Sequence, residues 1–479
     1  MKSASRLLAA ALLAGLALRM CLLLAPTAPL ATKVLEPTGD SPEYVRPASN
    51  LVHGHGFSQD SVPPFRPDIL RTPVYPLFLS LPYVVHRWPQ RPLSDSTSFF
   101  VLALALQLLL ALFTVWLTWR LALELGLGPG TSTFAALLVA LSPNLIFYSV
   151  KLTTETLFAS LLLMTLLLIN RFRALHRWPE LLASGACCGL LILTRPIAAF
   201  FPLVIAVYLL WLEFRVRNWQ LGIRNSVLLL ACASAVVAPW VIRNQRVAGR
   251  YIISTVFDYN ISVYTAALTL AADKLIPLNQ ARDSMVARAQ AQFGPLDTND
   301  QASYWAAMGK VGWQQALARP LLAARLHAAG SIGGLLMPLS VRSLLVFSGA
   351  HPEYGTTGAT HVAQQTIQLV ARGRLGQVLD LIWKERLSRM PGLALGILAY
   401  AILFHATLLI SGFVALFLRR SRNLLWLLLP ILYLVALTGP VGEARFRVPI
   451  EPLLCLFAAV ALTRLPKTSN DSPRGAHAV

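Results

Sequence analysis

The chain has 479 residues, of which 56% are hydrophobic and only 13% are charged. Soluble domains carry about twice that charged fraction, so the composition excludes an ordinary water-soluble protein. The 41 Lys and Arg residues outnumber the 21 Asp and Glu residues, which gives a net charge of +20. Because the basic residues stand between apolar runs, this excess indicates membrane topology and not nucleic-acid binding.

The apolar runs predict an all-α polytopic membrane protein with about ten transmembrane helices, each formed by about 17–25 mainly apolar residues. In chain order the predicted spans are 7–29, 97–118, 131–149, 153–170, 181–195, 196–213, 223–242, 392–418, 423–440 and 448–463. The first run follows Lys2 and Arg6 and is longer than the core of a signal peptide. We therefore expect an uncleaved anchor.

Two long polar stretches separate the spans and divide the chain into three parts. These are an N-terminal transmembrane module (1–242, with a first outer loop at 30–96), an outer segment (243–391), and C-terminal helices with a tail (392–479). Residues 73–85 are short and rich in proline, which predicts an interfacial or re-entrant helix. Residues 331–348 form either a surface helix or an additional span.

The short connections predict the orientation. With the N-terminus inside, the inner connections hold 15 Lys and Arg residues and the short outer ones hold four. Cytoplasmic connections carry the excess of basic residues, so both termini are expected in the cytoplasm of a cell bounded by this plasma (inner) membrane. Both long polar stretches then lie on the outer face.

Ionisable residues collect at the predicted outer ends of the spans, where charges are costly and usually mark a site. They are Asp40, Glu43, Arg71, Glu155, Arg195, Arg243, Glu443, Arg445 and Arg447. A single interfacial arginine often only extends toward the headgroups. Acidic residues gain little from anionic headgroups, which strengthens the case for the carboxylates. Arginines together with carboxylates on one face suggest a phosphate-bearing substrate and a general base.

Other motifs predict less. The sequence contains no Walker motif and no GxGxxG after a strand, so the use of ATP or NAD is not indicated. It contains no DxD, which argues against a nucleotide-sugar enzyme that holds its donor through a metal. His53 and His55 have no clear third ligand, and a divalent metal is possible but not indicated. The five cysteines lie in apolar runs and suggest neither a disulfide framework nor a metal site. The small residues of GACCG (185–189) predict close packing between helices.

Several blocks resemble a known family. GDSPEYVRPASNLVHGHGF followed by RTPVYPLFLSLPY is similar to the first outer loop of GT-C glycosyltransferases of the protein mannosyltransferase and aminoarabinose transferase type (glycosyltransferase family 39-like). Matching blocks follow in order: LSPNLIFYSVKLTTETLF, GLLILTRP, PWVIRNQRVAGRYIISTVFDYN and ARFRVPIEPLL. The resemblance covers roughly 1–265 and 425–465, and it leaves 270–390 without a recognised relative.

The resemblance implies a donor sugar, hexose or pentose, linked to a polyprenyl phosphate. It implies transfer with inversion to a glycolipid, glycan or protein acceptor on the outer (periplasmic) face. Asp40 takes the place of the base, with Glu43 beside it, and the implied phosphate-binding residues are Arg71, Arg243, Arg445 and Arg447. Further site candidates in or near these blocks are Tyr44, Tyr75, Glu155, Arg195 and Glu443. Many relatives carry two adjacent acidic residues, whereas Asp40 and Glu43 are three apart, which puts a direct metal role in doubt.

Three other functions remain open. A transporter or flippase for lipid-linked sugars predicts inverted repeats and charges near the middle of the membrane, and the sequence shows neither. An O-antigen polymerase or ligase has a similar topology, but its key arginines would lie chiefly in one large late loop. A non-catalytic scaffold would leave the outer carboxylates unexplained.

Overall fold

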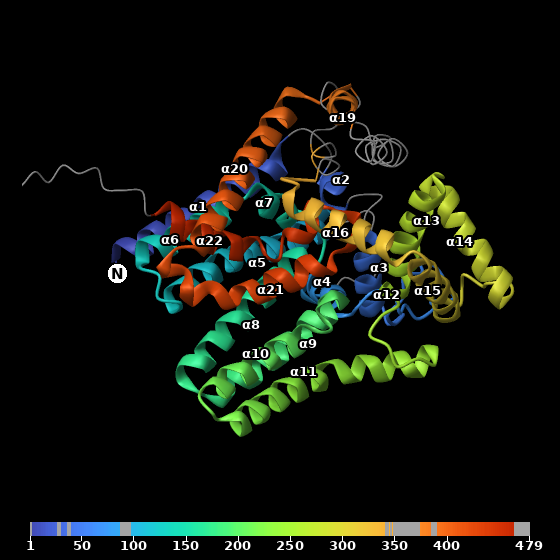
Figure 1. Cartoon of the computed structure of the whole chain (residues 1–479), viewed down its shortest axis with the longest axis horizontal. Coiled ribbons are helices and arrows are strands. Elements are labelled where there is room, and N and C mark those ends of the chain that lie inside the picture. The colour runs from blue at the N-terminus through green and yellow to red at the C-terminus, as the bar shows by residue number, and fades with distance from the viewer. Residues whose placement is uncertain are drawn as a thin grey trace, which may run out of the picture.

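The computed structural model describes residues 2–25, 30–35, 40–86, 97–340, 344, 347, 374–384 and 390–463. Throughout these residues the regular structure is helical and contains no β-strand. Most of the helices form one bundle, and a group of shorter helices, α12 to α15, stands at one end of it (Figure 1). The predicted all-α class is therefore confirmed.

The N-terminal half alternates long apolar helices with short polar ones. Its helices are α1 (Lys2–Leu24), α2 (Leu30–Leu35), α3 (Ser41–Val52), α4 (Val74–His86), α5 (Thr97–Glu124), α6 (Pro129–Leu141), α7 (Pro143–Ser149), α8 (Glu155–Leu175), α9 (Trp178–Thr194), η2 (Pro196–Ala198), α10 (Phe201–Arg215) and α11 (Trp219–Ala248).

The rest of the chain begins with the shorter helices and returns to the bundle. Its helices are α12 (Val256–Asn260), η3 (Ile261–Ala266, a π-helix), α13 (Ala267–Lys274), α14 (Leu278–Phe293), α15 (Gln301–Ala318), α16 (Pro320–Leu336), α19 (Leu375–Ile382), α20 (Gly392–Leu416), η6 (Arg419–Leu427), α21 (Leu428–Leu437), η7 (Gly439–Val441), η8 (Ala444–Arg447) and α22 (Glu451–Leu462).

Six segments are helical, long and apolar enough to cross a membrane: Ser5–Leu24, Phe99–Glu124, Glu155–Leu175, Pro196–Arg215, Trp219–Ala248 and Gly392–Leu416. The number rises to eight if two bent pairs count as single spans, namely α6 with α7 (57°) and Val256–Lys274 with α14 (113°). The expected count of ten is thus not confirmed. Trp178–Thr194, Ser421–Leu437 and Glu451–Leu462 are apolar but shorter than 18 residues.

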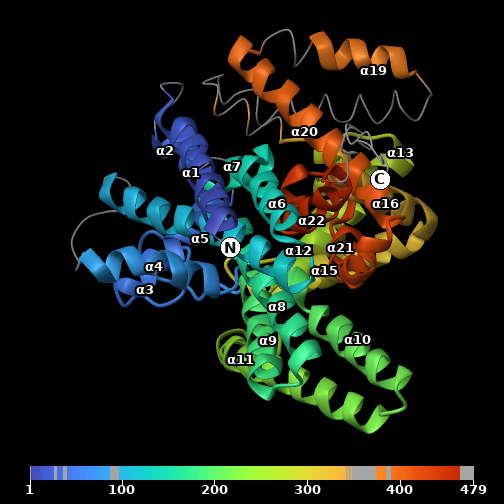
Figure 2. The ribbon, with the colours of Figure 1, turned by 90° about the vertical axis from the view of Figure 1, so that its left-hand side faces the viewer.

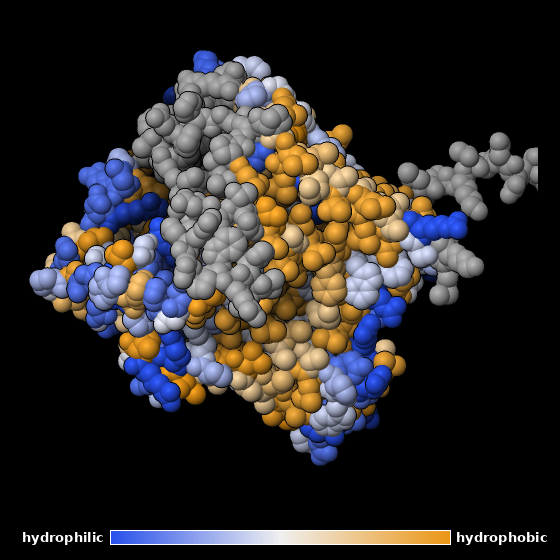
Figure 3. Space-filling view, turned by 180° about the vertical axis from the view of Figure 1, so that it is seen from behind, coloured by the Kyte–Doolittle hydropathy of each residue, from blue (hydrophilic) through white to orange (hydrophobic). Residues whose placement is uncertain are grey.

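The surface agrees with a multi-pass membrane protein. Apolar residues cover a broad face of the bundle, and polar residues gather toward its margins (Figure 3). Large apolar side chains are exposed along the helices, for example Phe200 and Phe214 near the two ends of α10 and Leu403 in α20. Soluble monomers rarely expose apolar patches of this extent, so lipid is the natural partner of this face.

Helices α8 to α11 lie together in the bundle. Helix α9 packs against both α8 and α11, and α10 packs against α11 (Figures 1 and 2). A Cβ atom at Gly185 would lie 2.8 Å from the carbonyl oxygen of Leu229, and one at Gly189 would lie 2.6 Å from Cβ of Val236. Only glycine permits so close an approach of α9 to α11. The predicted packing role of GACCG is confirmed.

Arg19, which interrupts the first apolar run, is buried within the bundle. Its Nε donates to Ser149 Oγ (2.9 Å), and its Nη1 donates to the carbonyl oxygens of Gly15 (2.8 Å) and Ala140 (3.2 Å). These bonds tie α1 to α6 and α7 and offset the cost of a buried charge.

The predicted interfacial segment 73–85 is a helix, α4, which packs against α3. The ambiguous stretch 331–348 begins inside α16, which ends at Leu336. Residues 341–343, 345, 346 and 348 of that stretch, and the C-terminal tail from 464, lie outside the described residues.

Candidate active site

Asp40 lies immediately before α3 and connects the two ends of the chain. Its Oδ1 accepts a hydrogen bond from Arg71 Nη2 at 3.0 Å, and its Oδ2 accepts one from Arg445 Nη2 at 2.5 Å. About 28% of the Asp40 side chain is exposed, whereas both arginines are largely buried. The carboxylate is therefore firmly held and still accessible to a substrate.

Glu43 extends the cluster from the first turn of α3. Its Oε2 lies 2.5 Å from Arg71 Nη2, so the two acidic residues, three positions apart, reach the same guanidinium group. Arg71 also lies over the ring of Tyr44, 5.1 Å from the centroid, and its Nη1 donates to Tyr44 Oη at 3.3 Å. Asp40, Glu43 and Tyr44, at and just before the start of α3, thus surround Arg71.

Glu155 forms the buried side of the cluster and is fully shielded from solvent. Its Oε1 accepts hydrogen bonds from Arg195 Nη1 (2.9 Å) and Arg445 Nε (2.5 Å). Its Oε2 is buried and has no hydrogen-bond partner among the described residues. The ion pairs form one chain, which runs Glu43–Arg71–Asp40–Arg445–Glu155–Arg195. Three carboxylates balance three guanidinium groups.

The helices bring these residues together because each stands at a helix end or in a connection. Glu155 opens α8, where a negative charge is favoured by the helix dipole. Arg195 follows α9, and Arg445 lies in the short 3-10 helix η8 between α21 and α22. The ends of several apolar helices therefore meet at one level of the bundle.

Electrostatics fix the protonation of the cluster. Burial raises the pKa of Asp40, but the charges of Arg445 and Arg71 outweigh burial and hold the pKa well below its usual range. Burial lowers the pKa of Arg445, yet the carboxylates of Glu155 and Asp40 outweigh it and raise the pKa. At neutral pH Asp40 is a carboxylate and Arg445 a guanidinium.

Tyr75, in α4, packs against Tyr44, which itself contacts Arg71. Its ring meets that of Tyr44 edge to face, with centroids 5.3 Å apart, and its hydroxyl donates to Gln107 Oε1 at 3.0 Å. Gln107 is fully buried in α5 and was not predicted as a site residue. A lone amide within the apolar run 97–118 is the signal that could have identified it.

Arg243 lies outside the ion-pair chain. Its guanidinium lies 4.7 Å from the centroid of the Trp240 ring and donates to the carbonyl oxygens of Asp68 (2.6 Å) and Phe57 (3.3 Å). These contacts fasten the segment between α3 and α4 to α11.

Arg447 is also outside the chain and is almost completely buried. It pairs with Glu451 at 3.1 Å and donates to carbonyl oxygens at the end of α16, including that of Pro338 at 2.9 Å. Glu443 contributes to the electrostatic environment of Arg445. Glu451 is a buried partner that sequence reasoning missed, although it stands in the same block as Arg447.

No group of three or more His, Cys, Asp and Glu side chains is arranged to hold a metal ion within the described ranges. His53 and His55 stack at 6.0 Å, and His55 also stacks on Phe65 at 3.9 Å. Within the same ranges all five cysteines are free thiols.

Residues 93–242 match the family model of dolichyl-phosphate-mannose-protein mannosyltransferases. The predicted resemblance is confirmed over this segment, which is less than a third of the chain. The segment contains Glu155 and Arg195 but not Asp40, Arg71 or Arg445. A comparison with curated proteins gives no match.

Two solved proteins illustrate the similarity of the chain to known structures. The oligosaccharyltransferase of Archaeoglobus fulgidus, in the apo form, is 14% identical with a TM-score of 0.47 over 96% of this chain and 50% of its own. The ArnT protein of Cupriavidus metallidurans, solved with undecaprenyl phosphate, is 14% identical with a TM-score of 0.38 over 96% of this chain and 78% of its own. The chain spans about half the length of the archaeal protein.

Proposed function

We propose that this protein is an integral membrane glycosyltransferase that moves a sugar from a polyprenyl-phosphate donor to an acceptor hydroxyl. The observation that carries the proposal is the double ion pair of Asp40 with Arg71 and Arg445. It places a carboxylate that can accept a proton beside two cations that can receive a leaving phosphate. The matched mannosyltransferase family agrees with this chemistry.

In the proposed reaction the acceptor oxygen attacks the anomeric carbon of the donor sugar. The bond from that carbon to the phosphate oxygen breaks, and the hydroxyl proton passes to Asp40. The phosphate leaves with the bonding electrons and gains negative charge, which Arg71, Arg445 and Arg195 stabilise. Fixed cations in a partly dry site are effective at this because they need no rearrangement during the step. Inversion at the anomeric carbon follows from attack opposite the phosphate.

The contacts support Arg71, Arg445 and Arg195 as the phosphate-binding set and give Arg243 and Arg447 a different role. The guanidinium groups of Arg243 and Arg447 are occupied by backbone carbonyl oxygens, and neither pairs with Asp40, Glu43 or Glu155 in any described contact. We propose that both hold the scaffold around the site.

We also propose that the site faces the outer (periplasmic) side of the plasma membrane. The cluster lies at the start of α8. Arg171, toward the other end of α8, pairs with Glu124 of α5, which also pairs with Arg120. The excess of basic residues at that other end supports its cytoplasmic placement, with both termini inside. The donor sugar, hexose or pentose, is then presented from the outer leaflet. The acceptor is a glycolipid, a glycan or a protein.

The test uses the full-length protein in lipid nanodiscs with undecaprenyl-phosphate-linked mannose and glucose, and a bacterial envelope extract as the source of acceptor. The measurement is the release of free undecaprenyl phosphate. Asp40→Asn removes the base and should lower turnover by about 100-fold or more, within the range for general acid–base catalysis. Asp283→Asn, at an exposed position on α14, serves as the control and should turn over normally.

Full turnover by Asp40→Asn would refute the role of the base. If protein that shows a cooperative thermal unfolding transition releases no undecaprenyl phosphate from either donor, transfer from undecaprenyl-phosphate-linked mannose and glucose is refuted. Movement of an intact donor across the bilayer without release would identify a transporter instead.

A further inference from the structure

Four aromatic side chains gather on the short helices at the end of the bundle. They are Tyr259 from α12, Tyr264 from η3, and Tyr304 and Trp305 from α15. The ring centroids of Tyr259 lie 4.9 Å from Trp305 and 5.7 Å from Tyr264, and Tyr304 lies 4.9 Å from Trp305. All four are half-buried, so part of each ring remains accessible. Helices α12 and α15 lie side by side in both views (Figures 1 and 2).

Hydrogen bonds place Tyr259 beside the charged cluster. The backbone N–H of Thr255 donates to the carbonyl oxygen of Ile69 at 3.0 Å, and the hydroxyl of Ser254 donates to that of Leu70. The turn that carries Arg71 is therefore fastened to the start of α12. Tyr259 stands one helical turn later and interacts electrostatically with Glu43 and Arg71.

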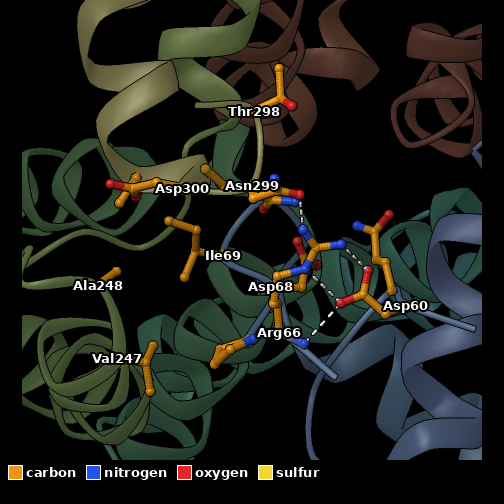
Figure 4. A pocket seen from close by; sticks show the side chains of 13 residues that line it. Asp60, Arg66, Asp68, Ile69, Val247, Ala248, Thr298, Asn299 and Asp300 are labelled. Carbon is orange, nitrogen blue, oxygen red and sulfur yellow. Dashed lines mark hydrogen bonds and ion pairs between the residues drawn. The ribbon is translucent and has the colours of Figure 1, made fainter. Parts of the chain in front are cut away.

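A polar pocket of about 210 Å³ adjoins the same segments. The first outer loop supplies Asp60 and Asp68, and the residues leading into α15 supply Asn299 and Asp300 (Figure 4). Arg66 bridges the two sides because it binds both Asp60 and the Asn299 side chain. The pocket reaches Gln301 and Ala302, the first residues of α15, and Tyr304 and Trp305 follow on the same helix within about one turn.

A pyranose ring matches this combination of surfaces. One face of such a ring carries C–H groups, which are attracted to the negative face of an aromatic ring, while its rim carries hydroxyls that need hydrogen-bonding partners. Binding sites for small polar ligands commonly pair aromatic walls with a few placed polar groups. An acyl chain would gain nothing from the carboxylates and amides of the pocket.

Packing alone accounts for some of these aromatics but not for all. Tyr304 and Trp305 pack against the small apolar core formed by α13 to α15, and Tyr259 is not among the residues packed against it. Tyr259 is half-buried, lies outside that core, and stands on a helix whose start is hydrogen-bonded to Ile69 and Leu70, next to Arg71. This placement distinguishes a binding surface from ordinary helix packing.

We propose that Tyr259 and Trp305 form a stacking platform for the pyranose ring of a substrate. The proposal rests on the proposed function, because it places a sugar next to the charged cluster. The ring belongs either to the acceptor glycan or to the donor, and both present the same chemistry to the platform. The platform would fix the position of that sugar relative to Asp40.

The same two helices supply a matched control. Phe257 on α12 and Trp313 on α15 form a second aromatic pair, with centroids 5.8 Å apart, and both are exposed. Phe257 pairs with Trp313, whereas Tyr259 pairs with Trp305, so the two pairs can be tested separately. The variants Tyr259→Ala and Trp305→Ala are therefore compared with Phe257→Ala and Trp313→Ala, each in full-length protein in nanodiscs.

The measurement is saturation-transfer difference NMR with a panel of methyl hexopyranosides of glucose, mannose and galactose. We expect at least one panel member to give signals from the wild type, strongest at the protons of one ring face. Tyr259→Ala and Trp305→Ala should lose at least three quarters of the signal, while Tyr259→Phe and both control variants should keep it. Absence of transfer from every panel member, or equal signals from wild type and Tyr259→Ala, would overturn the platform.

Two further experiments distinguish a donor sugar from an acceptor sugar on the platform. If the platform holds the donor sugar, undecaprenyl-phosphate-linked mannose should abolish the methyl-glycoside signal and undecaprenyl phosphate alone should not. If it holds the acceptor, the signal should persist with the donor bound, and Tyr259→Ala should raise the KM for acceptor with little change in the KM for donor. The NMR signal does not depend on turnover, so loss of the platform and loss of the proposed function give different results.

Discussion

Glu155 offers the sharpest test of how the charged cluster is held. It is fully buried, and its Oε1 accepts hydrogen bonds from both Arg195 and Arg445. Glu155→Gln removes the charge and keeps an oxygen that can accept those bonds. Glu155→Ala removes both. The two variants therefore separate the charge of Glu155 from its hydrogen bonding.

The expected changes have opposite signs for stability and for phosphate binding. Loss of the charge in Glu155→Gln should cost about 1.5–3 kcal/mol, the range for hydrogen bonds to charged groups. Glu155→Ala should cost about 3–5 kcal/mol, because it leaves buried cations uncompensated. The cluster would also gain one net positive charge. At a distance on the order of 8 Å and an effective dielectric constant of about 20, this favours a bound phosphate by about 2 kcal/mol, or roughly 30-fold in affinity.

Stability is followed by thermal unfolding of the protein in nanodiscs, and phosphate affinity by titration with farnesyl phosphate. Glu124→Gln is the control. Glu124, the last residue of α5, also accepts hydrogen bonds from two arginines, Arg120 and Arg171, but Arg171 lies toward the end of α8 that is far from Glu155. The arginine partners of Glu124 are about 41% and 34% exposed, so its charge should contribute about 1 kcal/mol or less and leave the farnesyl phosphate affinity unchanged. A Glu155→Gln variant with the unfolding temperature of the wild type, or one that binds farnesyl phosphate more weakly than the wild type, would refute this account of the cluster.

Three further predictions follow from the packing and the charges. Gly189→Leu should destabilise the protein by about 1–3 kcal/mol through overpacking of α9 against α11, measured by thermal unfolding beside the control Gly396→Leu, where a Cβ meets nothing; an unchanged transition would contradict it. Arg243→Leu should lower the unfolding temperature without changing farnesyl phosphate affinity, because its bonds go to backbone carbonyl oxygens; weaker binding in a folded variant would return Arg243 to the phosphate site. The depressed pKa of Asp40 means that its stabilisation is complete above the unfolded value, near pH 4, and is lost as pH falls further toward the folded value. Wild type should therefore lose more stability than Asp40→Asn between about pH 5 and pH 2 in unfolding scans, and parallel profiles would contradict this.

Much of the cluster could be predicted from the sequence for a physical reason. Charges next to apolar spans have little water to face, so they must find partners at the ends of the helices. That argument selected Asp40, Glu43, Arg71, Glu155, Arg195 and Arg445, and the structure joins these six in one chain of ion pairs. The chemical roles of the six remain predictions.

The rest depended on geometry that the sequence does not contain. Arg243 and Arg447 look like Arg445 in the sequence, but nearby carbonyl oxygens satisfy them, and only the folded chain shows which carbonyls are within reach. Apolar length predicted ten spans, and the helices do not confirm that count. The 131–149 run bends by 57° at Pro143, because proline cannot continue a helix from its preceding residues, and α9, α21 and α22 are short. Tyr259 was not predicted because the segment to which its helix is hydrogen-bonded, at Ile69 and Leu70, lies more than 180 residues earlier in the chain.

The balance of the cluster also bears on how Asp40 could act as a base. The two arginines that hold Asp40 keep its pKa low, and a carboxylate so stabilised is a poor acceptor of protons. A donor phosphate would compete with Asp40 for the same guanidinium groups, because its oxygens can form bidentate contacts with arginine, and the leaving phosphate gains a further negative charge as the sugar departs. As the arginines turn to the phosphate, Asp40 loses its counter-charges and its pKa rises toward that of a useful base. Substrate binding would thus activate the base in the proposed reaction. In the absence of a donor the ion pairs would keep the carboxylate ionised and catalytically quiet.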